Sequence, residues 1–103
     1  MKTRSDLTGA QRSYLRSLAH HLQPIGFIGK NGLTEAALES IATAFDADEL
    51  LKVKFIEFKE KKRELAAQIA ERTHSHPVGL IGNIAILYRE HPDPGKREIA
   101  LPQ

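Results

Sequence analysis

Residues 25–35 read IGFIGKNGLTE. Ile25, Phe27 and Ile28 are the β-branched and aromatic residues that favour a strand. Gly29 and Gly32 then bracket a two-residue tip, Lys30-Asn31. Glycine permits positive φ angles and leaves the neighbouring backbone N–H groups uncovered by a side chain. The stretch therefore predicts a strand followed by a tight loop with an accessible backbone.

A helix is expected to begin directly after this loop. Thr34 is a favourable N-cap residue and an apolar-periodic segment follows it. The loop then presents backbone N–H groups, the Lys30 ammonium and a helix N-terminus in one direction, which suits a phosphate. The spacing fits neither a Walker loop nor a dinucleotide-binding fingerprint. A short glycine-flanked turn with no ligand remains the alternative.

The composition indicates a small globular protein. The chain has 103 residues, with 41% hydrophobic and 27% charged residues, which suits one domain with one core. It contains no cysteine, so disulfides and cysteine-ligated zinc are excluded. It has neither an apolar run of the ~20 residues that a membrane helix needs nor an N-terminal secretory signal. We expect a cytoplasmic protein with no membrane partner.

The charges are unevenly distributed along the chain. The net charge is only +2, but residues 1–33 are basic and residues 34–51 contain acidic side chains with no lysine or arginine. The basic residues of the first part, opposed by Asp6 alone, are Lys2, Arg4, Arg12, Arg16 and Lys30. Such an uneven distribution offers a basic face to an anionic partner.

The first helix is expected from Thr8 to about Leu22. Thr8 and the glutamine three residues later fit a capping box. Arg12, Arg16 and His20 are four residues apart, so they share one face of this helix. These three residues are candidate contacts to an anion. A solvated helix surface explains the same spacing.

The remaining pattern predicts an α/β domain. Its elements are a helix from Glu35, a strand over 50–58, a helix over 59–72, strands over 77–81 and 84–89 joined by a turn at Gly82-Asn83, and a loose tail over 91–103. The order α-β-α-β-α-β-β predicts a two-layer domain with a four-stranded mixed sheet. Leu18, Ile41, Phe55 and Ile69 are expected to share one core.

No residue pattern suggests catalysis or a metal centre. The five histidines do not have the spacing of a metal site, and hydrolase and metalloprotease motifs are absent. We therefore expect no catalytic residue, no metal ligand and no cofactor.

The combination of motifs resembles the YhbY-like CRM family, named for chloroplast RNA splicing and ribosome maturation. The resemblance covers residues 7–102 and is carried by Leu7-Thr8-Gly9, Tyr14-Leu15-Arg16, Leu18-Ala19-His20, Leu22, Pro24, residues 28–34, Leu51-Lys52-Val53-Lys54, Ile81-Gly82 and Leu87-Tyr88-Arg89. It implies a single RNA-binding domain over 1–103, with its core at about 7–90. The implied fold is similar to the C-terminal domain of a bacterial translation initiation factor.

The resemblance also implies a partner and a site. The partner is RNA, and specifically ribosomal RNA in precursors of the large subunit; no DNA is expected, and the protein is expected to be a monomer. A G-x-x-G loop is the RNA contact, as in KH domains. The resemblance assigns RNA contact to Gly29, Lys30, Asn31 and Gly32, with Arg16 and His20 as partners on the helix. Arg12 joins them by its spacing, and Lys2, Arg4, Lys52 and Lys54 are further basic candidates. The basic cluster Lys59 to Arg63, preceded by Phe58, departs from the family pattern.

Two other functions compete with RNA binding. The acidic second helix, Glu35 to Glu49, could dock a basic protein. Alternatively, the glycine loop could hold the phosphate of a small substrate, with His20, His21 and Glu35 as the candidate acids or bases. A steep salt dependence that tracks Lys30 and Arg16 would favour RNA binding.

Overall fold

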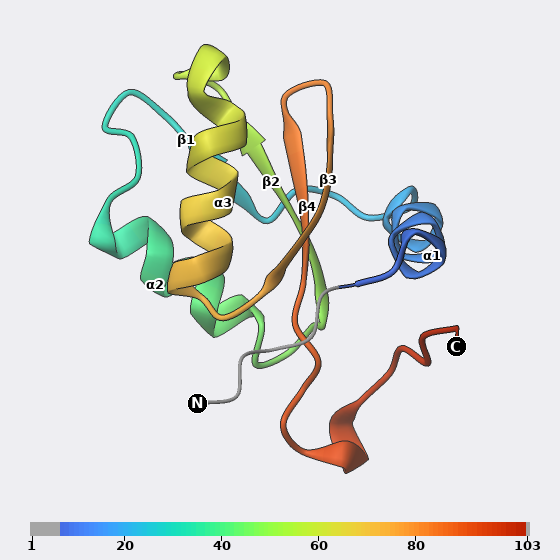
Figure 1. The fold of residues 1–103 in the computed structure, drawn as a ribbon. Coiled ribbons are helices and arrows are strands. Elements are labelled where there is room, and N and C mark those ends of the chain that lie inside the picture. Colours follow the sequence, from blue (N-terminus) through green and yellow to red (C-terminus); the bar gives the residue numbers. More distant parts are fainter. Residues whose placement is uncertain (1–6, 103) are drawn as a thin grey trace.

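The computed structural model describes residues 7–102, in which three α-helices accompany a four-stranded sheet (Figure 1). The elements in chain order are α1 (Gly9–Ala19), β1 (Gly26–Ile28), α2 (Glu35–Ala44), β2 (Leu50–Phe55), η1 (Lys59–Lys61), α3 (Lys62–Arg72), β3 (His76–Ile81), β4 (Ile84–Tyr88) and η2 (Pro94–Lys96), where η denotes a 3₁₀ helix. Lys2 and Arg4, which the sequence offered as further contacts, lie outside the described residues.

The sheet has the strand order β1-β2-β4-β3. β1 and β2 are parallel, as expected for strands joined by a crossover helix. β4 is antiparallel to both β2 and β3. Gly82 begins the β3–β4 turn with a φ of +60°, a value that a side chain rarely allows. The prediction of a mixed four-stranded sheet in the order α-β-α-β-α-β-β is confirmed.

The number of layers differs from the prediction. α2 and α3 cover one face of the sheet, whereas α1 packs on the other face, so the domain has three layers (Figure 1). Leu15 and Ala19 of α1 form an apolar cluster with Val78 and Ile86 of the sheet. A second apolar cluster lies under α2 and α3. The two clusters are separate because successive side chains along a strand point to opposite faces of the sheet.

The expected single core is therefore divided in two. Ile41, Phe55 and Ile69 lie together under α2 and α3, and each is almost completely buried. Leu18 packs instead against the α1 cluster on the opposite face of the sheet. Helical periodicity identified the buried faces correctly, but it does not specify which face of the sheet a helix covers.

The helix starts follow the expected capping chemistry. The Thr8 hydroxyl accepts from the Gln11 backbone N–H, and the Gln11 side chain accepts from the Thr8 N–H. The Thr34 hydroxyl accepts from Ala37 in the same way. The third helix begins at Lys62, later than predicted, because Phe58 adopts a left-handed φ of 57° and a 3₁₀ turn follows it.

The C-terminal segment, expected to be a loose tail, is anchored to the domain. Glu49, which is only 3% exposed, accepts hydrogen bonds from the backbone N–H groups of His91, Glu98 and Ile99. Ile99 and Leu101 pack against the α1 cluster. The sequence of residues 91–102 does not reveal this anchoring. The bonds to Glu49 use backbone N–H groups, which every residue except proline has, and the apolar residues are too few to form a pattern.

Candidate nucleic-acid interface

The glycine loop forms a tight turn between β1 and α2. The Gly32 N–H donates to the Gly29 carbonyl at 2.9 Å, which closes the turn around Lys30 and Asn31. Both tip side chains are exposed. The turn continues β1 directly, so the expected placement between the first strand and the second helix is correct.

The two glycines of the turn differ in backbone conformation and in the space beside them. Gly32 has a φ of +71°, and an added Cβ would meet the Phe58 ring at 3.5 Å. Gly29 does not have a positive φ, and no neighbouring atom lies within 4 Å of the position of an added Cβ. Gly32 is thus required by the backbone, whereas Gly29 leaves open space beside the main chain.

The basic residues of α1 are partly held by the fold. Arg12 donates to the Leu7 carbonyl at 2.7 Å. The stem of Arg16 lies across Gly79 of β3, where an added Cβ would meet the Arg16 Cδ at 3.2 Å, and its guanidinium points at the Val78 carbonyl at 3.5 Å. His20 is exposed at the C-cap of α1. Of the three, Arg16 is the one that the structure places against the sheet.

The two lysines of β2 are on the α1 face of the sheet. Lys52 donates to the Leu22 carbonyl at 3.0 Å and so ties the chain after α1 to the sheet. Lys54 is exposed and is paired in register with Phe27 on one side and Ile84 on the other. Ile84 is in turn paired with Ile81.

These pairings define a continuous line of side chains across all four strands. Residues that are directly opposite each other on neighbouring strands share a face of the sheet. We call Phe27, Lys54, Ile84 and Ile81 the open row, because Phe27 is 56% exposed and Ile81 57% exposed. Ile86, two residues further along β4, is buried by α1. The open row is thus the part of this face that α1 leaves uncovered.

The open row was missed when the sequence was read for charge and glycine alone. The signal was present in β1, where Gly26 and Ile28 alternate with Ile25 and Phe27. Ile28 is buried, and a Cβ at Gly26 would meet Val53 at 3.4 Å. Because the small and the buried residue face the core, Phe27 must point away from it.

The residues of the basic cluster Lys59 to Arg63 have different surroundings. Lys62 donates to the Gly82 carbonyl at 2.6 Å and to the Asn83 side chain at 3.1 Å, which holds the β3–β4 turn. Lys59 and Lys61 are exposed in η1. They follow Phe58, whose ring lies beside Gly32.

The acidic residues that could have docked a basic partner are largely engaged within the chain. Glu35 forms a bidentate pair with Arg72, at 2.8 and 3.1 Å. Asp46 pairs with Arg89 at 3.5 Å. Glu49 is buried by the C-terminal segment as described above. These contacts leave less free negative charge on this side of the domain than the sequence suggested.

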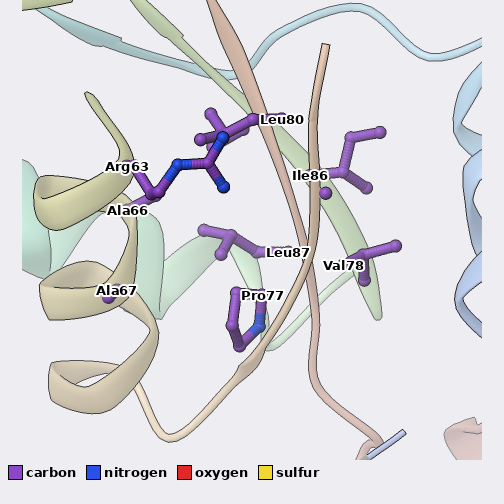
Figure 2. A pocket seen from close by; sticks show the side chains of 10 residues that line it. Arg63, Ala66, Ala67, Pro77, Val78, Leu80, Ile86 and Leu87 are labelled. Carbon is purple, nitrogen blue, oxygen red and sulfur yellow. The ribbon is translucent and has the colours of Figure 1, made fainter. Parts of the chain in front are cut away.

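A hollow of about 300 Å³ lies between α3 and the β3–β4 hairpin (Figure 2). Figure 2 shows Arg63 extending from α3 toward Leu80, with Leu87 and Pro77 below it. The lining is apolar apart from Arg63, so this hollow offers no acid–base pair. Within residues 7–102, no group of three or more His, Asp or Glu side chains could hold a metal ion, and no helix is long and apolar enough to cross a membrane.

Comparison with known proteins gives consistent matches. The CRS1/YhbY (CRM) domain family model matches residues 7–89. "Probable RNA-binding protein YqeI" of Bacillus subtilis is 39% identical over 97 residues, covering 93% of this chain and 99% of the relative. An "RNA-binding protein" of Haemophilus influenzae is 40% identical over 84 residues, covering 81% of this chain and 85% of the relative.

One solved structure has the same fold at similar identity. The solution structure of a hypothetical protein from Staphylococcus aureus, a candidate RNA-binding protein, superposes with a TM-score of 0.78 at 39% identity. The match covers 91% of this chain and 99% of the other. The names of all three proteins refer to RNA binding.

Proposed function

Because the chain belongs to the CRS1/YhbY (CRM) domain family, we propose that it is an RNA-binding protein whose glycine loop and first helix hold the RNA backbone. In this proposal Lys30 and the backbone of the Gly29–Gly32 turn contact phosphates, except for the Gly32 N–H, which closes the turn on the Gly29 carbonyl. Arg12, Arg16 and His20 on α1 supply further positive charge, and Lys52 and Lys54 lie between the two. The protein acts by binding, without catalysis or a cofactor.

The observation that carries this proposal is the geometry of the turn. The Lys30 side chain is exposed at its tip, and no atom occupies the space beside Gly29. A nucleic-acid backbone needs both features, because phosphates attract the cation and the sugar must come close to the main chain. A turn that served only to connect β1 to α2 would need the positive φ of Gly32 but not the open side of Gly29.

The finer part of the proposal concerns the RNA and the setting. We propose that the RNA is ribosomal, in precursors of the large subunit, and that the protein binds it as a monomer in the cytoplasm. The family resemblance supports this choice of RNA. Co-sedimentation of the tagged protein with precursor or mature large subunits in sucrose gradients, at low and high salt, tests it.

The backbone contacts are tested by RNA affinity at several salt concentrations. Lys30→Ala should weaken binding to unrelated RNA sequences by a similar factor and reduce the salt slope by about one contact. Glu39→Ala removes an exposed charge from α2 and is the matched control. It should leave binding unchanged or strengthen it. If Glu39→Ala loses RNA binding while Lys30→Ala does not, the binding surface is the acidic helix α2.

The open side of Gly29 gives a second, independent test. Gly29→Ala adds one methyl group where the fold has space, so stability should be unchanged while RNA binding weakens. Gly9→Ala is the control, since its added Cβ also meets no atom within 4 Å but lies at the start of α1. If both variants bind RNA like the wild type, the backbone does not approach Gly29.

A further inference from the structure

We propose that the open row is a stacking platform for unpaired RNA bases, with the Phe27 ring as its centre. This inference rests on the proposed function and specifies its substrate: RNA with single-stranded nucleotides, in preference to a continuous duplex. The loop and α1 hold the backbone, and the uncovered sheet face between them receives bases.

The row is continuous because the strand register aligns it. Phe27 is opposite Lys54, Lys54 is opposite Ile84, and Ile84 is opposite Ile81, on β1, β2, β4 and β3 in turn. Neighbouring strands are about 4.8 Å apart, so the four positions form one surface. α1 covers the same face only from Ile86 onward.

The exposure of these apolar side chains is the first argument for a ligand. Phe27 is 56% exposed, Ile81 57% and the adjacent Ile25 47%. An exposed contiguous apolar patch on a small protein commonly marks an interaction site. An aromatic ring on a sheet face is the feature on which RNA-binding sheets stack bases, since every base has a π-face.

The charged residues around the open row favour an anionic ligand. Within their described bounds, α1 and the four strands contain no aspartate or glutamate, although the chain has 13 acidic residues. Lys54 lies inside the row and Lys52 beside it. Glu57, just after the end of β2, donates its backbone N–H to the carbonyl of Ile28, the neighbour of Phe27. Lys54 within the row and Lys52 beside it outnumber the single glutamate near its loop end, and this balance of charge matches a nucleic acid better than a neutral protein surface.

The position of the row explains why the bases must be unpaired. The glycine loop continues β1 just beyond Phe27, and α1 borders the row on its other side. RNA that contacts both therefore passes over the row. A base can stack on a ring only if one of its faces is free, and in a duplex both faces are occupied by neighbouring base pairs.

The test uses Phe27→Trp as a fluorescent reporter. The chain contains no tryptophan, so the variant has a single indole at the centre of the row. It is titrated with an oligoadenylate of about 12 nucleotides and with the same strand annealed to its complement. We expect quenching by the single strand and little response to the duplex. Gln68→Trp, on the exposed side of α3, is the matched control and should respond to neither.

Affinity measurements separate stacking from general apolar contact. Phe27→Ala and Phe27→Leu should each weaken binding of the single strand by about 5- to 100-fold, while Phe27→Tyr should bind like the wild type. Neither of the two weakened variants should change the salt slope, because no phosphate contact is removed. If Phe27→Leu binds like the wild type, stacking is excluded.

The outcomes distinguish this inference from the function on which it rests. If Lys30→Ala weakens binding and Phe27→Ala does not, RNA binding stands and the platform is overturned. If neither variant changes affinity, the proposed function itself fails. If the Phe27→Trp emission shifts with protein concentration in the absence of RNA, a second copy of the chain covers the row, which also overturns the inference.

Discussion

The two faces of the sheet are built differently. On the face under α2 and α3, strand residues such as Val53 and Phe55 are fully buried. On the other face, α1 and the C-terminal segment bury Ile86 and Tyr88 but leave Phe27 and the rest of the open row exposed. The first face is a complete core, whereas the second combines a core with a free surface.

We infer from this difference that one face of the sheet mainly stabilises the fold and that the other is available for binding. A fully covered face contributes stability in proportion to the apolar area removed from water. A face that is half uncovered gives up part of that stabilisation. The uncovered face is also the one proposed above to bind RNA, and α1 and the strands that form it contain no acidic residue within their described bounds.

The largest expected effect contrasts one phenylalanine from each face. Phe55→Ala removes a completely buried ring and should lower the free energy of unfolding by about 3–5 kcal/mol. Phe27→Ala should change it by about 0.5 kcal/mol or less. Urea unfolding of both variants measures the contrast. A large loss of stability for Phe27→Ala would show that the open row is part of the core.

The next prediction concerns the segment that completes the partly covered face. Glu49→Gln places an amide N–H where the carboxylate accepts from the backbone at 2.8–3.0 Å. It should lower stability by about 2–3 kcal/mol, because buried donors lose a charged partner. Hydrogen exchange at the amides of Glu98 and Ile99 should accelerate. Asp48→Asn, on an exposed neighbour, is the control and should change neither quantity.

A smaller effect separates the two glycines at the end of β1. Gly32→Ala forces a side chain into the left-handed region at a φ of +71° and should lower stability by about 1–2 kcal/mol. Gly29→Ala should unfold like the wild type. Thermal or urea unfolding of the pair checks this. Equal losses would mean that the turn rearranges and that both glycines serve the fold.

Much of the fold could be predicted from local sequence signals. The Thr8 and Thr34 caps, the Gly82 turn and the apolar periodicities depend on residues that are close in the chain. The layer count, the division of the core and the role of Glu49 could not, because each depends on contacts between distant segments. The Glu49 carboxylate, for example, is joined to Ile99 across 50 positions of sequence.

The candidate site was predictable to a different degree. The glycine spacing identified the turn, and the structure adds that Gly29 and Gly32 differ in their surroundings. The stripe on α1 was identified by its spacing, but the involvement of Arg16 with β3 needs the tertiary fold. The open row exists only through the register of four strands, which no local pattern specifies.

The smallest effect at neutral pH concerns Tyr88, the buried tyrosine of the α1 face. Its hydroxyl has no hydrogen-bond partner among the described residues, so Tyr88→Phe should leave stability unchanged or raise it by up to about 1 kcal/mol. Burial, with the nearby carboxylates of Glu49 and Glu90, raises the pKa of Tyr88 from 10.0 to about 12.

This raised pKa predicts a pH dependence with a definite sign. Above pH 10 the unfolded chain loses the phenolic proton before the folded chain does, so folding stability falls as the pH rises from 10 to 12. The loss should reach about 1 kcal/mol near the middle of this window. Tyr88→Phe should remove that part of the alkaline loss, as urea unfolding at several pH values can measure. If wild type and variant lose stability in parallel, Tyr88 ionises as easily in the folded protein as in the unfolded chain, and the α1 face is more open around it than the structure indicates.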